Sequence, residues 1–92
     1  MPVRVLVVDD NTRIRQMLCG RLESAGIAVI AEAAGGREAL TILDDLAADV
    51  DVVVIDHQMP QMTGLAAAEA ILARSPDQHV LVCTAALTPC PR

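Results

Sequence analysis

Short runs of β-branched residues alternate along the chain with longer segments in which apolar residues recur every three or four positions. The short runs predict strands at residues 3–8, 27–33, 50–55 and 79–84. The longer segments predict three helices, which start near Thr12, after Gly36 and near Leu65. This alternation is typical of an α/β fold, in which a doubly wound parallel sheet carries helices on both faces.

The first predicted helix has signals for both of its ends. Asn11 or Thr12 can cap its start, because a short polar side chain accepts a hydrogen bond from a free amide of the first turn. Gly26 fits its C-terminal stop, where a left-handed backbone favours glycine. The third predicted helix ends near Ser75, because the following Pro76 disfavours helix in the residue before it.

The run from Val50 to Ile55 is nearly continuous Val and Ile, as expected for a central parallel strand that is buried on both faces. It ends at Asp56. A chain of 92 residues holds one domain at most. Its hydrophobic content is 53% without any aromatic residue, so the core must be built from aliphatic side chains.

The charge balance argues against several partners. Seven arginines, no lysines and twelve acidic residues give a net charge of −5, which disfavours nucleic acid and anionic membranes. Asp9 and Asp10 end the first apolar run far short of a membrane span, and no signal-peptide pattern is present, so we expect a cytoplasmic protein. The three cysteines lack CxxC spacing and a histidine partner, so they indicate neither a disulfide framework nor a zinc site.

Acidic residues follow two of the predicted strands. Ligands of parallel α/β sheets bind at the carboxyl ends of the strands, where Asp9 and Asp10 end the first strand and Asp56 ends the third. Thr84 ends the fourth. If the first and third strands are neighbours, three carboxylates meet in one shallow pocket without a lysine to neutralise them.

Such a cluster favours a divalent cation. Two carboxylates about 4 Å apart repel each other by about 4 kcal/mol at an effective dielectric constant near 20. Carboxylate and carbonyl oxygens suit Mg²⁺, with Mn²⁺ as the alternative. Once a metal is bound, one carboxylate can attack phosphorus and form an aspartyl phosphate, and Thr84 can donate a hydrogen bond to a phosphoryl oxygen.

Each acidic residue also has a purely structural interpretation. Asp56 could simply start a turn, and Asp9 with Asp10 could cap the following helix. Other phosphate chemistries fit less well, because the chain has neither a G-x-x-x-x-G-K-[ST] loop nor a G-x-G-x-x-G turn. A phosphatase of the haloacid-dehalogenase type would carry a second Asp two positions after its nucleophile, but Asn11 stands there.

Three segments resemble the receiver-domain family of two-component signalling, the CheY-like response regulators. VRVLVVDDN resembles the family's first strand and acidic pair, and VVVIDHQMPQMTG resembles its phosphorylation segment. HVLVCTA is similar to its fourth strand. The resemblance implies a flavodoxin-like (βα)5 fold of which only about (βα)3-β4 is present, with strand order 2-1-3-4. We expect an incomplete receiver domain over residues 1–88 and a short Pro-containing tail over 89–92.

The resemblance also implies roles for individual residues. Asp56 would accept a phosphoryl group from a sensor histidine kinase or a small phosphodonor, and Thr84 would contact that group. Mg²⁺ would be held by Asp10, Asp56 and the backbone carbonyl of Gln58, with Asp9 helping through water. Gly64 would adopt a backbone conformation that is closed to other residues.

The chain also departs from the family pattern. The family continues through a fourth helix, a fifth strand that carries a lysine, and a fifth helix, whereas this chain has no lysine at all. We expect the fourth strand to be an edge and Val80 to Cys83 to meet water or a partner. An exposed apolar edge strand favours pairing with a second copy, so we expect a homodimer or higher association.

Three function classes follow. The first is a phosphoacceptor module that is a signalling domain and not a turnover enzyme, with activity reduced or lost because the lysine is missing. The second is a pseudo-receiver, an interaction or dimerisation module that takes no phosphate. The third, a small Mg²⁺-dependent phosphohydrolase, lacks a visible general acid or base. DNA binding is not expected, because no residues here could form a helix-turn-helix.

Overall fold

The computed structural model describes residues 2–46, 49–56 and 63–83. Strands and helices alternate in these ranges in the order β1 (Arg4–Val8), α1 (Thr12–Ser24), β2 (Ala28–Ala33), α2 (Gly36–Leu46), β3 (Val52–Asp56), α3 (Gly64–Arg74) and β4 (His79–Cys83). The predicted strands and helices are therefore confirmed.

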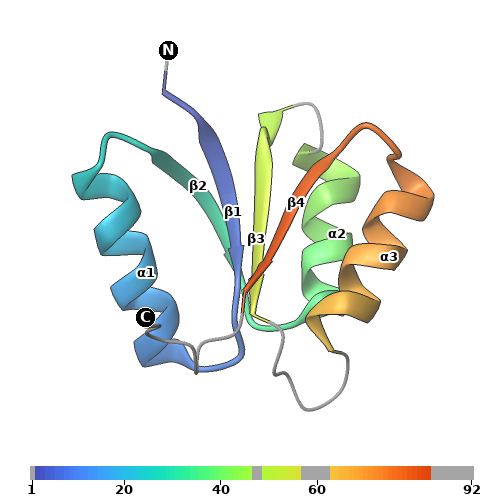
Figure 1. Ribbon diagram of the computed structural model, residues 1–92, viewed down its shortest axis with the longest axis horizontal. Helices are drawn as coiled ribbons and strands as arrows, with labels where there is room; N and C mark the ends of the chain where they lie inside the picture. The colour runs from blue at the N-terminus through green and yellow to red at the C-terminus, as the bar shows by residue number, and fades with distance from the viewer. Residues whose placement is uncertain (1, 47–48, 57–62, 84–92) are drawn as a thin grey trace, which may run out of the picture.

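The strands form one parallel sheet in the order β2-β1-β3-β4. Figure 1 shows α1 on one face of this sheet and α2 with α3 on the other. The predicted fold class, a doubly wound parallel sheet with strand order 2-1-3-4, is confirmed. The central strands are β1 and β3, which carry the acidic residues at their ends.

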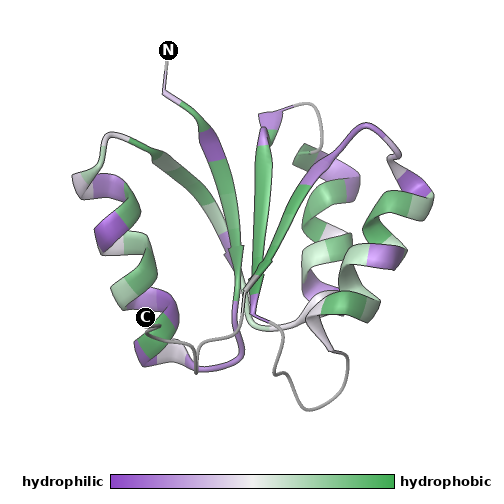
Figure 2. Ribbon diagram, in the orientation of Figure 1, coloured by the Kyte–Doolittle hydropathy of each residue, from purple (hydrophilic) through white to green (hydrophobic). Residues whose placement is uncertain are grey.

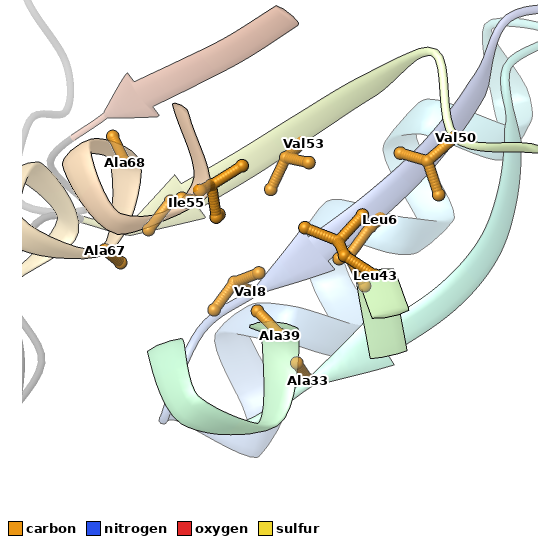
Figure 3. Close-up of a cluster of buried hydrophobic side chains, with 11 residues drawn as sticks. Leu6, Val8, Ala33, Ala39, Leu43, Val50, Val53, Ile55, Ala67 and Ala68 are labelled. Carbon is orange, nitrogen blue, oxygen red and sulfur yellow. The ribbon is translucent and has the colours of Figure 1, made fainter. Parts of the chain in front are cut away.

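The larger part of the core lies between the sheet and the helix pair α2 and α3 (Figure 3). Alternate residues of the central strands point to this face, and Leu6, Val53 and Ile55 are completely buried. Small residues of the helices lie opposite them, since Ala39 and Ala67 are also completely buried. Because these side chains are single methyl groups, the helices can pack close to the sheet. The core therefore needs no aromatic residue to fill the space between them.

The second part of the core lies between the sheet and α1. It contains Val5, Val7 and Val54 from the strands and Cys19 from the helix. Because β1 and β3 are covered on both faces, almost every residue in them is apolar, and Figure 2 shows these strands as hydrophobic along most of their length. Burial on both faces explains why the sequence of β3 is nearly continuous Val and Ile.

The ends of α1 follow the predicted signals. The side chain of Asn11 accepts a hydrogen bond from the amide of Ile14 at 3.0 Å, so Asn11 is the N-cap and Thr12 is the first helical residue. Beyond the C-terminus, Gly26 has φ +86°. That left-handed conformation is the one that glycine adopts without steric strain.

The expectation for Gly64 is wrong. Gly64 is the first residue of α3 and is buried, and Gly26 alone among the described residues has a positive φ. Thr63 caps α3 by accepting a hydrogen bond from the amide of Ala66 at 3.1 Å. None of the helices in the described ranges is long and apolar enough to cross a membrane.

The start of β3 lies two residues later than the sequence pattern suggests, because Asp51 is engaged with β1. The carboxylate of Asp51 accepts hydrogen bonds from the backbone amide of Arg4 at 2.8 Å and from its guanidinium at 3.3 Å. The guanidinium also reaches Asp49 at 3.5 Å. This polar contact joins the N-terminal ends of β1 and β3. Asp9 and Asp56 lie at the opposite, C-terminal ends of these strands.

The expectation that the whole of β4 meets water or a partner is wrong for two of its residues. Val80 and Val82 are half-buried against the core on the α2 and α3 face. Leu81 points the other way and is 57% exposed. Within the described residues β4 is an edge strand, as expected, and Leu81 is an exposed large apolar residue in it.

The contact between Arg4 and Asp51 should make stability depend on pH. Hydrogen bonds from Arg4 lower the pKa of Asp51 below its usual range. A lowered pKa gives stability that is present above the ordinary value of about 4 and is lost as the pH falls through the lowered one. We expect Asp51→Asn to lower the free energy of unfolding at neutral pH, with a difference from wild type that shrinks in acid.

Urea denaturation at a series of pH values measures this difference. The matched control is Asp77→Asn, which removes the same charge from an exposed turn. A loss that is independent of pH, or an equal loss in the control, would contradict the assignment.

Candidate metal site

Three carboxylates gather at the carboxyl ends of the central strands. One ligand oxygen each from Asp9, Asp10 and Asp56 lies within 4.8 Å of the others. Asp9 and Asp56 are 2% and 7% exposed, whereas Asp10 is exposed. The site is therefore shallow, with two carboxylates in its floor and one at its rim.

The register of the sheet explains this gathering. In the parallel pair β1 and β3, Val8 lies opposite Ile55. The next residue on each strand is an aspartate, so Asp9 and Asp56 emerge side by side at the same edge. Asp10 follows immediately in the turn that leads to α1.

The backbone and carboxylate of Asp9 are held by hydrogen bonds. Its amide donates to the carbonyl of Ala33 in β2 at 3.0 Å. Its carboxylate accepts the amide of Asn11 at 2.8 Å. Burial raises the pKa of Asp9, the hydrogen bond from Asn11 lowers it, and the nearby charges of Asp56 and Asp10 raise it further. An ionised Asp9 is thus disfavoured by its surroundings unless a cation is present.

Arg15 is the basic side chain that contacts this turn. Its Nη1 donates to the backbone carbonyl of Asp9 at 2.7 Å, and its Nε donates to the carboxylate of Glu32 at 3.0 Å. The Arg15 side chain is 16% exposed. It lies beside the acidic cluster. Its charge lowers the pKa of Asp9, but this effect is the smallest of those acting on that group.

The chemistry of the donor set fits a hard divalent cation. Two carboxylates separated by about 4 to 5 Å repel each other by about 3 to 4 kcal/mol at an effective dielectric constant near 20. All three ligand groups offer oxygen, and the exposure of Asp10 leaves room for water. Oxygen ligands with several waters are the preference of Mg²⁺ and Mn²⁺.

The structure brings together three of the five residues proposed from the sequence for this site. Asp9, Asp10 and Asp56 converge, whereas Gln58 and Thr84 lie outside the described residues. The alternative in which Asp9 and Asp10 cap α1 is wrong, because Asn11 provides that cap.

Sequence reasoning missed Arg15. The sequence carries a weak signal, because basic residues near the start of a helix oppose the helix dipole, but Arg13 carries it as well as Arg15. The contacts with the acidic turn and Glu32 distinguish Arg15.

Neither Cys19 nor His79 contributes to the site. Cys19 is buried in the core under α1, and burial raises the pKa of its thiol. His79 begins β4 and therefore lies at the far end of the sheet. Neither residue joins the group of possible metal ligands formed by Asp9, Asp10 and Asp56.

A doubly wound parallel sheet of order 2-1-3-4 with an acidic cluster at the ends of β1 and β3 defines a CheY-like, flavodoxin-like domain. The family model for the response regulator receiver domain matches residues 5–89. The chain belongs to this family of two-component signalling proteins.

Curated relatives include both small and large proteins. The chain is 39% identical over 85 residues to the chemotaxis protein CheY of Thermotoga maritima, a match that covers 92% of this chain and 69% of that protein. It is 41% identical over 80 residues to protein-glutamate methylesterase/protein-glutamine glutaminase 2 of Caulobacter vibrioides, covering 87% of this chain but 22% of that protein. The second relative shares only its receiver portion with this chain.

A solved structure shows the same fold. The CheX-CheY-BeF3-Mg complex from Borrelia burgdorferi matches with a TM-score of 0.86 and 29% identity, over 92% of this chain and 63% of that chain. The chain therefore spans a little under two thirds of this structural relative.

Mutual repulsion in the cluster predicts that a neutral residue stabilises the metal-free protein. We expect Asp9→Asn to raise the free energy of unfolding in a chelator by about 1 to 4 kcal/mol, the range between aqueous and partly buried charge pairs. Asparagine keeps an oxygen that can accept the amide of Asn11. Urea denaturation measures the change, and Glu69→Gln, which removes a charge from the exposed side of α3, should have little effect.

Adding Mg²⁺ should reverse the order, because the wild type keeps the charge that binds the cation and gains stability through binding. A metal-free Asp9→Asn protein that is less stable than wild type would contradict the repulsion.

Proposed function

We propose that this chain is a phosphoacceptor receiver domain, in which Asp56 takes a phosphoryl group from a sensor histidine kinase or a small phosphodonor in a Mg²⁺-dependent step. The observation that carries the proposal is the convergence of Asp9, Asp10 and Asp56 at the carboxyl ends of β1 and β3 in a member of the receiver family. The receiver extends over residues 1–88 in this proposal, and 89–92 form a short tail.

The reaction is a substitution at phosphorus. A carboxylate oxygen of Asp56 forms a bond to phosphorus while the bond from phosphorus to the donor atom breaks and the donor leaves with its electron pair. Asp56 suits this role because it ends β3 in the floor of the site. Thr84 is proposed to contact the phosphoryl group.

Asp9, Asp10, Asp56 and the backbone carbonyl of Gln58 are the proposed Mg²⁺ ligands. When bound, the cation offsets the negative charge of the carboxylates and of the incoming phosphoryl oxygens. Support comes from the donor chemistry of the three aspartates and from the structural relative in Borrelia burgdorferi, which was solved with BeF3 and Mg²⁺.

The proposed role is that of a cytoplasmic signalling domain and not of a turnover enzyme. The relative from Caulobacter vibrioides is a protein-glutamate methylesterase/protein-glutamine glutaminase, but the match covers only 22% of that protein. DNA binding is not part of the proposal, and the net charge of −5 disfavours it.

Self-association through β4 is part of the proposal as well. Leu81 projects from this edge strand with 57% of its surface exposed. Complete burial of a fully exposed leucine contributes roughly 1.5 to 3 kcal/mol, and the exposed part of Leu81 would contribute a share of that. A second copy, paired through its own β4, would cover both the strand edge and Leu81.

Phosphorylation is tested by intact mass spectrometry after incubation with Mg²⁺ and acetyl phosphate. We expect the wild type to gain one phosphoryl group, and Asp56→Asn to gain none because the nucleophilic oxygen is gone. Chelation of Mg²⁺ should abolish the gain in the wild type. Glu69→Gln, with the same change in charge, should behave as wild type.

A wild type that binds Mg²⁺ and is folded but gains no phosphoryl group would contradict the proposal. That result would favour the pseudo-receiver, an interaction module in which the acidic site takes no phosphate. Release of phosphate from unrelated monoesters would instead indicate a phosphohydrolase.

Self-association is tested by light scattering over a range of micromolar concentrations. We expect Leu81→Lys to lower the average mass, because a charge at the strand edge opposes pairing. Leu65→Lys is the matched control, since Leu65 on α3 is also 57% exposed. A wild type that is monomeric at every concentration would contradict pairing through β4.

A further inference from the structure

Arg15 connects three parts of the molecule that meet beside the acidic cluster. It belongs to α1, its Nη1 binds the Asp9 carbonyl at 2.7 Å, and its Nε binds the Glu32 carboxylate on β2 at 3.0 Å. Its side chain is 16% exposed, less than that of Arg4 at 34% or Arg74 at 54% in their ion pairs. The guanidinium is therefore held in a defined place.

The carbonyl that Arg15 binds belongs to the peptide group between Asp9 and Asp10. This group is planar, so a hydrogen bond to its oxygen, together with the one that holds the Asp9 amide, restricts the orientation of the whole plane. The orientation in turn sets the direction in which the chain continues to Asp10. The amide of Asp9 is held by its hydrogen bond to the Ala33 carbonyl, and the carboxylate of Asp9 is held by the hydrogen bond from the Asn11 amide.

Glu32 fixes the position of the Arg15 guanidinium relative to the sheet. In the parallel pair of β1 and β2, Glu32 lies opposite Val7, two residues before Asp9. A charge-assisted hydrogen bond to Glu32 is stronger than a neutral one. The planar fork of arginine can serve two acceptors at a fixed angle, which the single ammonium group of lysine cannot do.

We propose that Arg15 is a positioning residue of the metal site, which holds the Asp9–Asp10 peptide so that both carboxylates face Asp56. This inference rests on the proposed function, because it assumes that the three aspartates bind Mg²⁺. Arg15 does not touch the cation in this proposal. It acts through the backbone of Asp9, and Glu32 acts through Arg15.

A purely electrostatic role makes the opposite prediction. A positive charge near the site repels Mg²⁺, so its removal would tighten binding if charge alone mattered. Loss of the hydrogen bonds to Asp9 and Glu32 would weaken binding if position matters. A purely structural role would change stability without changing the affinity of the folded protein for Mg²⁺.

Mg²⁺ titration by calorimetry on the folded chain separates these roles. We expect Arg15→Met to weaken Mg²⁺ binding roughly tenfold, at the lower end of the effect seen when partners of metal ligands are removed. Arg15→Lys should weaken it as well, although the charge is kept. Glu32→Gln, which retains an oxygen for the guanidinium, should bind Mg²⁺ more tightly than Glu32→Ala.

Arg74→Met is the matched control. Arg74 pairs with Asp44 at 2.7 Å between α3 and α2, so this variant loses the same side chain and the same charge away from the site. Urea denaturation of all variants should show that they are folded, and the Mg²⁺ affinity of the control should equal that of wild type.

The outcomes are distinct. A Mg²⁺ affinity of Arg15→Met that equals or exceeds that of wild type would overturn the positioning role and leave the proposed metal site intact. Equal weakening in Arg74→Met would overturn it in the same way, because the effect would not depend on the site. A wild type that binds no Mg²⁺ would overturn both the metal site and the role of Arg15.

Discussion

The parallel pairing of β1 with β3 is the constraint on which the rest of the molecule depends. These strands occupy the centre of the sheet, and their side chains are buried on both faces. If the pairing slipped by one residue, Leu6 or Val53 would turn away from α2 and α3. The burial of these side chains therefore fixes the register. With Val8 fixed opposite Ile55, the two chains leave the core together and place Asp9 beside Asp56.

Charged side chains are arranged differently at the two ends of the central strands, which form the N-terminal and C-terminal edges of the sheet. At the N-terminal edge, Asp51 accepts hydrogen bonds from both the backbone and the guanidinium of Arg4, so the negative charge there is matched. At the C-terminal edge, three carboxylates meet while Arg15 gives its hydrogen bonds to the backbone of Asp9 and to Glu32. The mutual repulsion of these three carboxylates opposes folding and favours cation binding. Functional sites often keep such a local conflict, which the core stabilises from elsewhere.

The receiver domain occurs in relatives of different length. The receiver matches a small chemotaxis protein over 69% of its length and a methylesterase over 22% of its length. What this chain shares with these proteins is the receiver domain, which the family model matches over residues 5–89, and not the rest of the longer relative. The proposed positioning by Arg15 also belongs to the module, because all its contacts lie within β1, α1 and β2.

The sequence alone determined the order of strands and helices, because burial on two faces demands continuous apolar runs and burial on one face demands a helical period. It also indicated the acidic residues, since Asp9, Asp10 and Asp56 interrupt those runs at their ends. Only the tertiary structure decided that Val80 and Val82 are sheltered while Leu81 is exposed, and that Arg15 reaches Asp9 and Glu32. The physical reason is distance along the chain: a periodic pattern is local, whereas the contact between Arg15 and Glu32 joins residues that become neighbours only when α1 packs beside β2.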